Sequence, residues 1–408
     1  MARPEKRRHR RSLAHVGGAV EVWGQDPHLT SLLVRALDVG AEEGTRDHVH
    51  GFHSYPARMH PRMAERLLAS LSNRGGLVLD PFCGSGTVLV EARRAGRRAV
   101  GIDANPLAIE LTWLKTRGAT HREALALIEV AGSLRAKADE RRLRRAGATR
   151  SYGAEDVALF DPHVLLELDS LQRGLRELES GFVRRALFLV LSAILVKVSR
   201  RPGDTSEGRG PRRLAAGFTS ALFFDKTREL AQRLEDFRRP CPEDAPSVQV
   251  EVGDARALPR SLAGVDLVVT SPPYPGTYDY LSHHALRLRW LGLDTTTFAQ
   301  TELGARRHFV HLSGAAGLAR WQTDFGAALG AMSRTLGPGG TIVLVMADSV
   351  IGRRALYADE EVRRLAPAAH LEMCAVGSQP RPHFHGPSAR SFDRRPRREH
   401  AMLLRRGR

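Results

Sequence analysis

The sequence predicts an α/β fold: a mostly parallel sheet interrupted by a helical insertion and completed by an antiparallel C-terminal hairpin. Two stretches, residues 76–86 and 98–112, each lead from an apolar run through a polar turn toward a helix. Parallel sheets are built from this alternation. Further strand-like runs appear after residue 247, and the long segment before them has helical spacing.

The first 50 residues are interpreted as a basic arm over residues 1–12, a short apolar-periodic piece, "HLTSLLVRALDV", and then a polar linker. Folding is expected to begin near residue 51, and residues 51–116 form the first part of the α/β domain. Within it, "PRMAERLLASL" at 61–71 repeats apolar residues at spacings of three and four and has a proline at its start. This pattern predicts a helix ahead of the first central strand.

Residues 117–246 are predicted to form the helical insertion. Its most apolar stretch, 186–198, is shorter than the roughly 20 residues that a bilayer span needs, so a buried helix is expected. The arginine-rich stretch at 197–213 suits a loop that contacts DNA, and it equally suits an ordinary solvated loop. The insertion is therefore a candidate target-recognition region.

Residues 247–408 are predicted to form the second part of the α/β domain. Helices are expected at 319–336 and 358–366, and "GPGGTIVLVMADS" is expected to hold a strand after a glycine-proline turn. The apolar runs "HLEMCAVGSQ" and "EHAMLLRR" then favour a closing antiparallel hairpin.

Composition limits the class of protein. The 408 residues carry a formal net charge of +17, which indicates a polyanionic partner such as nucleic acid. Cys83, Cys241 and Cys374 lie far apart, which argues against a disulfide framework or a cysteine zinc site, and no metal is predicted. No apolar segment of signal-peptide length follows the N-terminus, so a cytoplasmic protein without a membrane partner is expected.

A glycine-rich turn follows the first central strand. Gly84 and Gly86 let a ligand approach the backbone, and Asp103 ends the next strand, where a carboxylate can accept from both hydroxyls of a ribose. The turn lacks the third glycine of a dinucleotide fingerprint and the Gly-Lys-Ser/Thr of a phosphate loop. It therefore favours a nucleoside carrier without a pyrophosphate, and a turn that serves packing alone is the alternative.

A second unusual stretch, "TSPPY", ends a β-branched run. Because prolines cannot donate to a sheet, the strand is expected to stop at Ser271. A proline-stiffened turn after a core strand is the plain interpretation of these residues taken alone.

Together these stretches resemble a known family. "DPFCGSGT" with "GIDANP" is similar to the S-adenosylmethionine-binding motif of the DNA amino-methyltransferases, and "TSPPY" is similar to their catalytic motif. "HSYPARMHPRMAERLL" resembles the segment that closes over the methionine end of the cofactor. The resemblance covers roughly residues 50–116 and 247–405, and it implies a Rossmann-like class I methyltransferase sheet with S-adenosylmethionine as cofactor.

The resemblance also implies site residues. Asp103 would bind the ribose, Asp254 would meet the adenine amino group, and the segment 55–57 would flank the methionine moiety. The residues implied to bind the cofactor are Tyr55, Pro56, Ala57, Asp80, Phe82, Gly84, Gly86, Asp103 and Asp254.

The catalytic motif comprises Ser271, Pro272, Pro273 and Tyr274. An exocyclic amine of a base is a poor nucleophile because its lone pair is delocalised into the ring. The Ser271 side chain and the Pro272 carbonyl can hold the two amine protons, while Tyr274 stacks on the base. A base inside a duplex cannot be reached, so it must be flipped into the site.

In the resembled family, serine at the first motif position is typical of enzymes acting on cytosine N4, and aspartate or asparagine of those acting on adenine N6. Ser271 therefore predicts a cytosine-N4-specific DNA methyltransferase. Adenine-N6 methylation and methylation of an RNA base of the guanine-N2 type are the alternatives. Double-stranded DNA is the expected partner, a cognate restriction enzyme is a further candidate, and the sequence specifies no oligomeric state.

Overall fold

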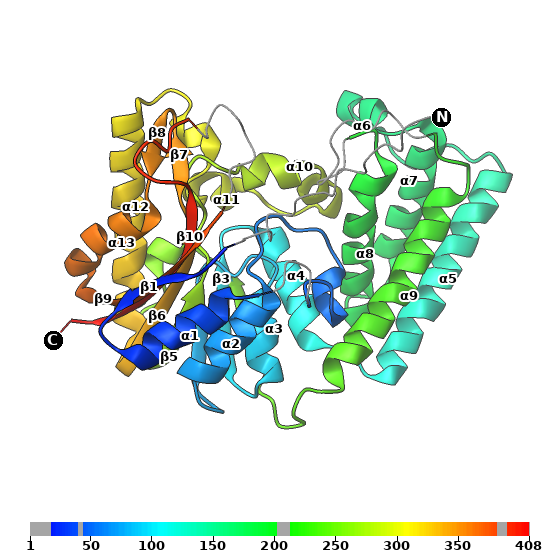
Figure 1. Ribbon diagram of the computed structural model, residues 1–408. Coiled ribbons are helices and arrows are strands. Elements are labelled where there is room, and N and C mark those ends of the chain that lie inside the picture. The colour runs from blue at the N-terminus through cyan, green and yellow to red at the C-terminus, as the bar shows by residue number, and fades with distance from the viewer. Residues whose placement is uncertain (1–17, 40–43, 202–212, 382–389, 408) are drawn as a thin grey trace, which may run out of the picture.

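The computed structural model describes residues 18–39, 44–201, 213–381 and 390–407. The predicted basic arm and most of the 197–213 loop lie outside them. Within the described part, eight strands form one sheet and two more form a short hairpin (Figure 1). In sheet order the strands are β1 (Glu21–Gly24), β9 (Leu371–Pro380), β10 (Arg398–Arg406), β6 (Leu336–Ala347), β5 (Val265–Thr270), β2 (Leu77–Asp80), β3 (Arg98–Asp103) and β4 (Gln249–Val252). The hairpin pairs β7 (Ser349–Ile351) with β8 (Arg354–Leu356).

The directions of the strands confirm the predicted fold class. From β4 to β6 the neighbours run parallel, whereas β10 runs antiparallel to both β6 and β9. The order reverses between β2 and β5, because β3 and β4 follow β2 outward on one side and β6 follows β5 on the other. In sheets of this kind ligands bind at that reversal, beyond the carboxyl ends of the strands.

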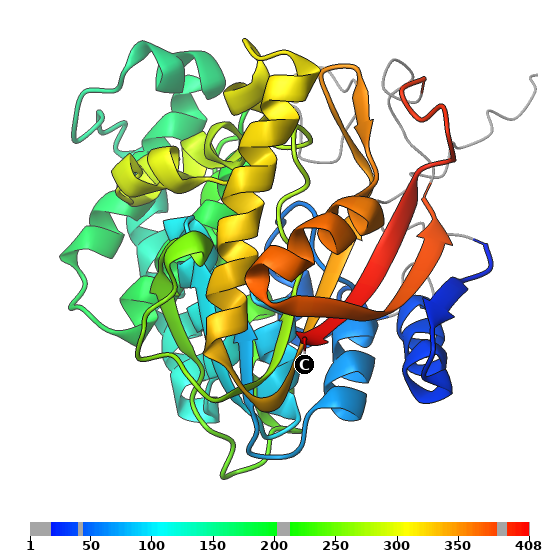
Figure 2. The same cartoon turned by 90° about the vertical axis from the view of Figure 1, so that its left-hand side faces the viewer.

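Helices cover both faces of the sheet (Figure 2). Side chains along a strand alternate between the faces: Val78 of β2 packs in the core under the first three helices, and Leu79 packs in the core under α12. The helices over the first face are α1 (Pro27–Leu37), α2 (Pro61–Leu71) and α3 (Thr87–Arg94), and those over the second are α12 (Gly314–Thr335) and α13 (Ala358–Leu365). The predicted helix at 61–71 coincides with α2.

The N-terminal side differs from the expectation that folding begins near residue 51, although the apolar-periodic piece noted there does form a helix. Instead β1 extends the sheet by pairing with β9, and α1 buries Leu32, Leu33 and Leu37 in the core of the first face. The side chain of Asp26 caps α1 by accepting from the backbone N–H of His28 at 2.8 Å. Residues 18–37 therefore belong to the α/β domain.

Helices fill the chain between the two parts of the sheet domain, as the spacing predicted, and Figure 1 shows them as a bundle beside the sheet. They are α5 (His121–Leu143), α6 (Ala154–Leu159), α7 (Pro162–Glu177), α8 (Phe182–Val198) and α9 (Phe218–Arg238). Their core continues into α4 (Pro106–Arg117) and into α10 (Tyr280–Leu291), whose Trp290 donates to Asp156 at 3.0 Å. Because α10 follows the proline motif in the sequence, the bundle packs directly on the segment that comes after this motif. Among the described helices, none is long and apolar enough to cross a membrane.

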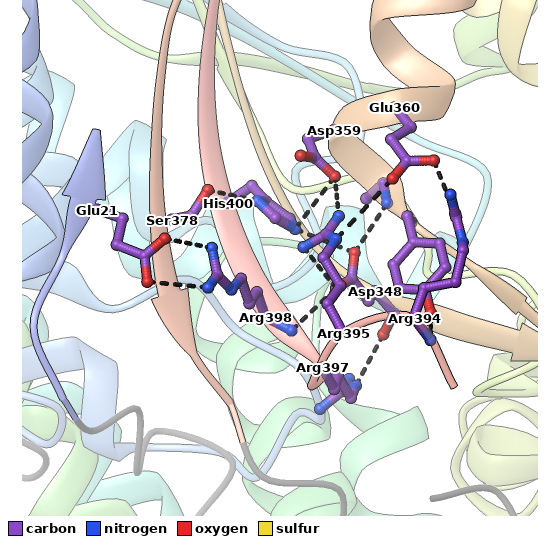
Figure 3. Close-up of polar contacts among 12 residues, drawn as sticks. Glu21, Asp348, Asp359, Glu360, Ser378, Arg394, Arg395, Arg397, Arg398 and His400 are labelled. Carbon is purple, nitrogen blue, oxygen red and sulfur yellow. Dashed lines mark hydrogen bonds and ion pairs between the residues drawn. The ribbon is translucent and has the colours of Figure 1, made fainter. Parts of the chain in front are cut away.

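A buried carboxylate, Asp348, ties the end of β6 to the start of β10 (Figure 3). It accepts from the backbone N–H of Arg398 at 2.9 Å and bonds to Nε2 of His400 at 3.0 Å. The other ring nitrogen of His400 bonds to the hydroxyl of Ser378 on β9 at 2.8 Å. Burial acts to raise the pKa of Asp348, but His400 and Arg395 together hold it below its ordinary value. This network fixes the register of three strands.

Replacing Asp348 by asparagine is expected to lower the free energy of unfolding at neutral pH by about 0.5 to 1.5 kcal/mol. The folded pKa of Asp348 lies below the unfolded value of about 3.9, so its carboxylate stabilises the fold above that pH and loses this contribution as the pH falls through the folded pKa. Urea unfolding of both proteins at neutral and at acid pH measures the difference, which should shrink in acid. If the two proteins differ in free energy of unfolding by the same amount at both pH values, the charge of Asp348 does not stabilise the fold.

Candidate active site

The candidate site is a pocket at the carboxyl ends of β2, β3 and β5, where the strand order reverses. It encloses about 840 Å³, including open solvent at its mouth, which suits a small-molecule ligand. The predicted site residues that line it are Tyr55, Pro56, Ala57, Asp80, Phe82, Gly84, Asp103, Asp254, Ser271 and Pro273. Three predicted residues, Gly86, Pro272 and Tyr274, are not among its lining residues.

The two glycines of the turn between β2 and α3 have different surroundings. Gly84 has a φ of +50°, and a Cβ there would lie 3.3 Å from the ring of Tyr55 across the pocket. Gly86 has a φ of +84°, and a Cβ there would lie 2.8 Å from the side chain of Thr112 on α4. Gly84 therefore keeps the pocket open, whereas Gly86 allows helix packing and left-handed backbone.

Asp103 ends β3 with its carboxylate at the pocket. One oxygen accepts from the N–H of Gly84 at 2.8 Å, and the other accepts from the N–H of Asn105 at 2.9 Å. The side chain therefore orders the glycine turn as well as facing the ligand space. Burial raises the pKa of Asp103 to about 6, against the opposing effect of these two hydrogen bonds.

Asp80 ends β2 and connects the glycine turn to the proline motif. It accepts from the hydroxyl of Thr270, the last residue of β5, at 2.6 Å, and from the N–H of Phe82 at 3.2 Å. Burial raises the pKa of Asp80 to about 7. Since Ser271 follows Thr270 directly, this bond holds the start of the proline motif beside the cofactor turn.

The segment before α2 forms another wall of the pocket. The hydroxyl of Tyr55 accepts from Asn105 at 3.1 Å, and its ring stacks on His284 of α10 with 4.8 Å between centroids. Ala57 has a φ of +52°, a left-handed conformation that side chains other than glycine rarely adopt. The three residues that the sequence assigned to this wall therefore do lie at the pocket.

Asp254 lines the pocket but also has a local partner. Its carboxylate accepts from the backbone N–H of Arg256 at 2.9 Å and from the guanidinium of the same residue at 2.8 to 3.0 Å. It caps the short helix η2 (Ala255–Ala257), and Arg256 reaches Asp324 of α12 at 2.6 Å. A ligand amine would share this carboxylate with Arg256.

One side of the pocket comes from the chain after the proline motif, where Tyr280, Phe298 of α11 (Thr296–Thr301) and Glu302 line it. The sequence pointed to the segment of Tyr280 as a contact for the flipped base or the phosphates, but it gave no sign of Phe298 and Glu302. Glu302 accepts from the N–H of Tyr280 at 2.7 Å. It also pairs at 2.6 Å with Arg307, which lies in the short helix η3 (Arg306–Phe309). Their separation in the sequence gave no motif by which to find them.

The residues present fit a nucleoside carrier. Asp103 offers a carboxylate where a ribose would need acceptors, and Gly84 lets the backbone approach. Ser85, in the same turn, lines the pocket with a buried hydroxyl that has no hydrogen-bond partner in the described structure. A buried hydroxyl without a partner is costly, so it points to a polar ligand.

The affinity for S-adenosylmethionine, the cofactor that the sequence implies, should fall as the pH drops below about 6. Ribose hydroxyls bond more strongly to an ionised carboxylate than to a neutral carboxyl, and with a pKa of about 6 Asp103 is protonated in acid. Titration calorimetry between about pH 5 and 8 measures this effect, and Asp103→Asn should remove the step near pH 6. An affinity independent of pH contradicts the assignment.

Two groups outside the pocket bring histidine and carboxylate atoms within 4.8 Å of one another, as in metal sites. In the first, His50 bonds to one oxygen of Glu91 at 2.7 Å, and Arg94 donates to the other oxygen at 2.7 Å, with His48 close by. We assign this group to ion pairing, because the arginine already balances the carboxylate.

The second group is the C-terminal network of Figure 3, formed by Asp348, Asp359 and His400. Arg395 contacts both carboxylates, at 3.4 Å in the case of Asp348. Its guanidinium supplies the positive charge that a metal would bring, so this group too is assigned a structural role.

Comparison with known proteins matches residues 8–113 to the family model described as DNA methylase. The Type II methyltransferase M.MjaII of Methanocaldococcus jannaschii is 39% identical over 71 residues, which are 17% of this chain and 13% of that protein. A tRNA (guanine(10)-N2)-dimethyltransferase of Methanothermobacter thermautotrophicus is 40% identical over 86 residues, 20% of this chain and 25% of that protein. The chain thus matches a minor part of the length of each relative.

Among solved structures, TrmN of Thermus thermophilus is similar over 85% of this chain and 49% of its own. The sequence identity is 12% and the TM-score is 0.32. A likeness at that level is too weak to assign a function.

Proposed function

We propose that this chain, whose residues 8–113 match the family model described as DNA methylase, transfers a methyl group from S-adenosylmethionine to the N4 amine of cytosine in DNA. The single observation that carries the proposal is the meeting of two motifs at one pocket. Gly84 and Asp103, from the cofactor half, line the same space as Ser271 and Pro273. The bond from Thr270 to Asp80 holds the two halves together.

When bound, S-adenosylmethionine supplies a methyl group activated by its sulfonium. The protein must make the acceptor amine nucleophilic and aim it. The Ser271 side chain and the Pro272 carbonyl would accept the two amine protons, which localises the nitrogen lone pair. The cofactor would supply the methyl group to the amine nitrogen, and its sulfur would keep the electron pair of the broken C–S bond. The methylated amine would lose its proton past the acceptor at Ser271 to solvent, and no covalent bond to the protein would be needed.

The choice of base rests on Ser271. In the family that the motif resembles, serine is typical at this position for cytosine N4, and we extend that preference to this chain. Adenine-N6 methylation is the second candidate, since pocket shape also selects the base. Methylation of a guanine N2 in RNA is the third, favoured by the local similarity to a tRNA methyltransferase.

We propose double-stranded DNA as the partner, with the target base flipped out. The net charge of +17 suits a polyanion. The helical bundle of α5 to α9 is the proposed target-recognition region, because it packs on α10, immediately after the catalytic motif. A cognate restriction enzyme, cleaving the same DNA sequence that this protein would methylate, is a further proposed partner.

The test is incubation with labelled S-adenosylmethionine and either duplex DNA or tRNA, followed by nucleoside mass spectrometry. N4-methylcytosine from the DNA sample is the expected product. N6-methyladenine would overturn the choice of base and keep the reaction class. A methylated guanosine from tRNA alone would replace the proposed substrate by RNA.

A further inference from the structure

The C-terminal hairpin brings a carboxylate to the proline motif. Because β10 runs antiparallel to β6 while β5 runs parallel to it, the first residues of β10 lie beside the last residues of β6, at the carboxyl end of β5. Glu399 accordingly pairs in register with Ala347 of β6. The chain order thus places Glu399 near the turn that starts at Ser271.

The contact between them is direct. The hydroxyl of Tyr274 donates to Oε1 of Glu399 at 3.1 Å, and Glu399 is 6% exposed. The same carboxylate oxygen accepts from Arg381 of the hairpin, which is also buried. Arg381 therefore balances the buried charge of Glu399 and orients it toward the tyrosine.

The backbone that carries Glu399 is held on both sides. The N–H of Arg381 donates to the carbonyl of Arg397 at 2.9 Å, and Arg397 donates through Nε to the carbonyl of Asp348 at 2.7 Å. Next along β10, His400 belongs to the buried network of Figure 3. Because its neighbours on the strand are fixed, Glu399 is a rigid acceptor.

We propose that Glu399 is a positioning residue that fixes the ring plane of Tyr274 for stacking on the flipped base. This inference rests on the proposed function. The oxygen of Tyr274 lies on the long axis of its ring, so a hydrogen bond to a fixed acceptor restricts the first side-chain torsion directly. Because a phenol O–H prefers to lie in the ring plane, the same bond also favours one orientation of the ring. The ring is then ordered before the base arrives, so stacking costs less conformational entropy.

The test compares variants of the full chain in single-turnover methylation of DNA. Glu399→Leu keeps the size of the side chain and removes the acceptor, and the rate should fall about 2- to 13-fold, the range for one hydrogen bond. Glu399→Gln keeps an acceptor oxygen and should retain most of the rate. The affinity for S-adenosylmethionine, measured by calorimetry, should stay unchanged in both.

A double-mutant comparison separates positioning from a merely structural role. In a Tyr274→Phe background, which keeps the ring without the hydroxyl, Glu399→Leu should cost no further rate. Glu21→Leu is the matched control. Glu21 of β1 pairs at 2.6 Å with Arg398, the neighbour of Glu399 on β10, so this variant also removes an ion pair of that strand, and we expect a wild-type rate. Equal losses in both backgrounds would overturn the proposal.

If Glu399→Leu does not fold, Tyr274→Phe alone decides, because it leaves the pair of Glu399 and Arg381 intact. It should show the same 2- to 13-fold loss, and a full wild-type rate would overturn the proposal. Absence of methylation by the wild-type protein would instead defeat the proposed function. A methylating wild type with unaffected variants defeats the role of Glu399 alone.

Discussion

Replacement of Tyr274 by alanine is expected to lower the rate of single-turnover methylation about 5- to 150-fold. The substitution removes a stacking surface worth roughly 1 to 3 kcal/mol per base. Tyr274 does not line the cofactor pocket, so the affinity for S-adenosylmethionine should stay nearly unchanged. Single-turnover kinetics and titration calorimetry on the same preparation measure the two effects separately.

The competing account treats the proline motif as a stiff turn after a core strand. The ring of Tyr274 packs on the core under α12, so under that account its loss lowers the melting temperature and leaves the rate of the folded protein unchanged. Tyr274→Phe keeps the stacking surface and should lose far less rate than the alanine variant. A destabilised alanine variant with wild-type turnover would defeat the catalytic assignment.

Local signals in the sequence predicted much of the sheet domain. The periodic helix at 61–71 and the strand that stops before Ser271 depend on neighbouring residues, and both are found as expected. The antiparallel closing hairpin was also predicted, since its two apolar runs end the chain. Signals of this kind can be read from the sequence because apolar periodicity and the effect of proline on a strand depend only on residues a few positions apart.

The N-terminal strand could not be predicted in the same way. In β1 the residues Glu21 to Trp23 are exposed, so the segment lacks an alternating apolar pattern. Its pairing partner is β9, far away in the sequence, and Trp23 opposite Val376 becomes visible only in the fold. Strand propensity depends on such long-range contacts more than helix propensity does.

The site shows the same division. Motifs identified Asp103 and Gly84, which do line the pocket, but a motif cannot tell which of two glycines faces a ligand. Thr112 of α4 decides that question by filling the space beside Gly86. Glu399 escaped notice entirely, because its link to Tyr274 joins residues brought together by the strand order alone.

Asp103→Ala is expected to weaken the binding of S-adenosylmethionine by roughly 1 to 3 kcal/mol, or about 5- to 150-fold. Two losses contribute. The ribose hydroxyls lose their acceptor, and the N–H groups of Gly84 and Asn105 lose the carboxylate that orders the turn. Titration calorimetry at about pH 7.5, where the native carboxylate is ionised, gives the affinity, and the melting temperature reports the cost to the turn.

A matched control separates the ligand contact from the loss of a backbone cap. Asp266, at the start of β5, accepts from the N–H of Leu77 at 2.7 Å, at the end of the sheet opposite to the pocket. Asp266→Ala removes a comparable hydrogen bond and should leave the cofactor affinity unchanged. If both variants lose stability but only Asp103→Ala loses affinity, Asp103 acts at the ligand. Unchanged affinity in a folded Asp103→Ala protein removes Asp103 from the site, and with it the assignment of this pocket to a nucleoside carrier.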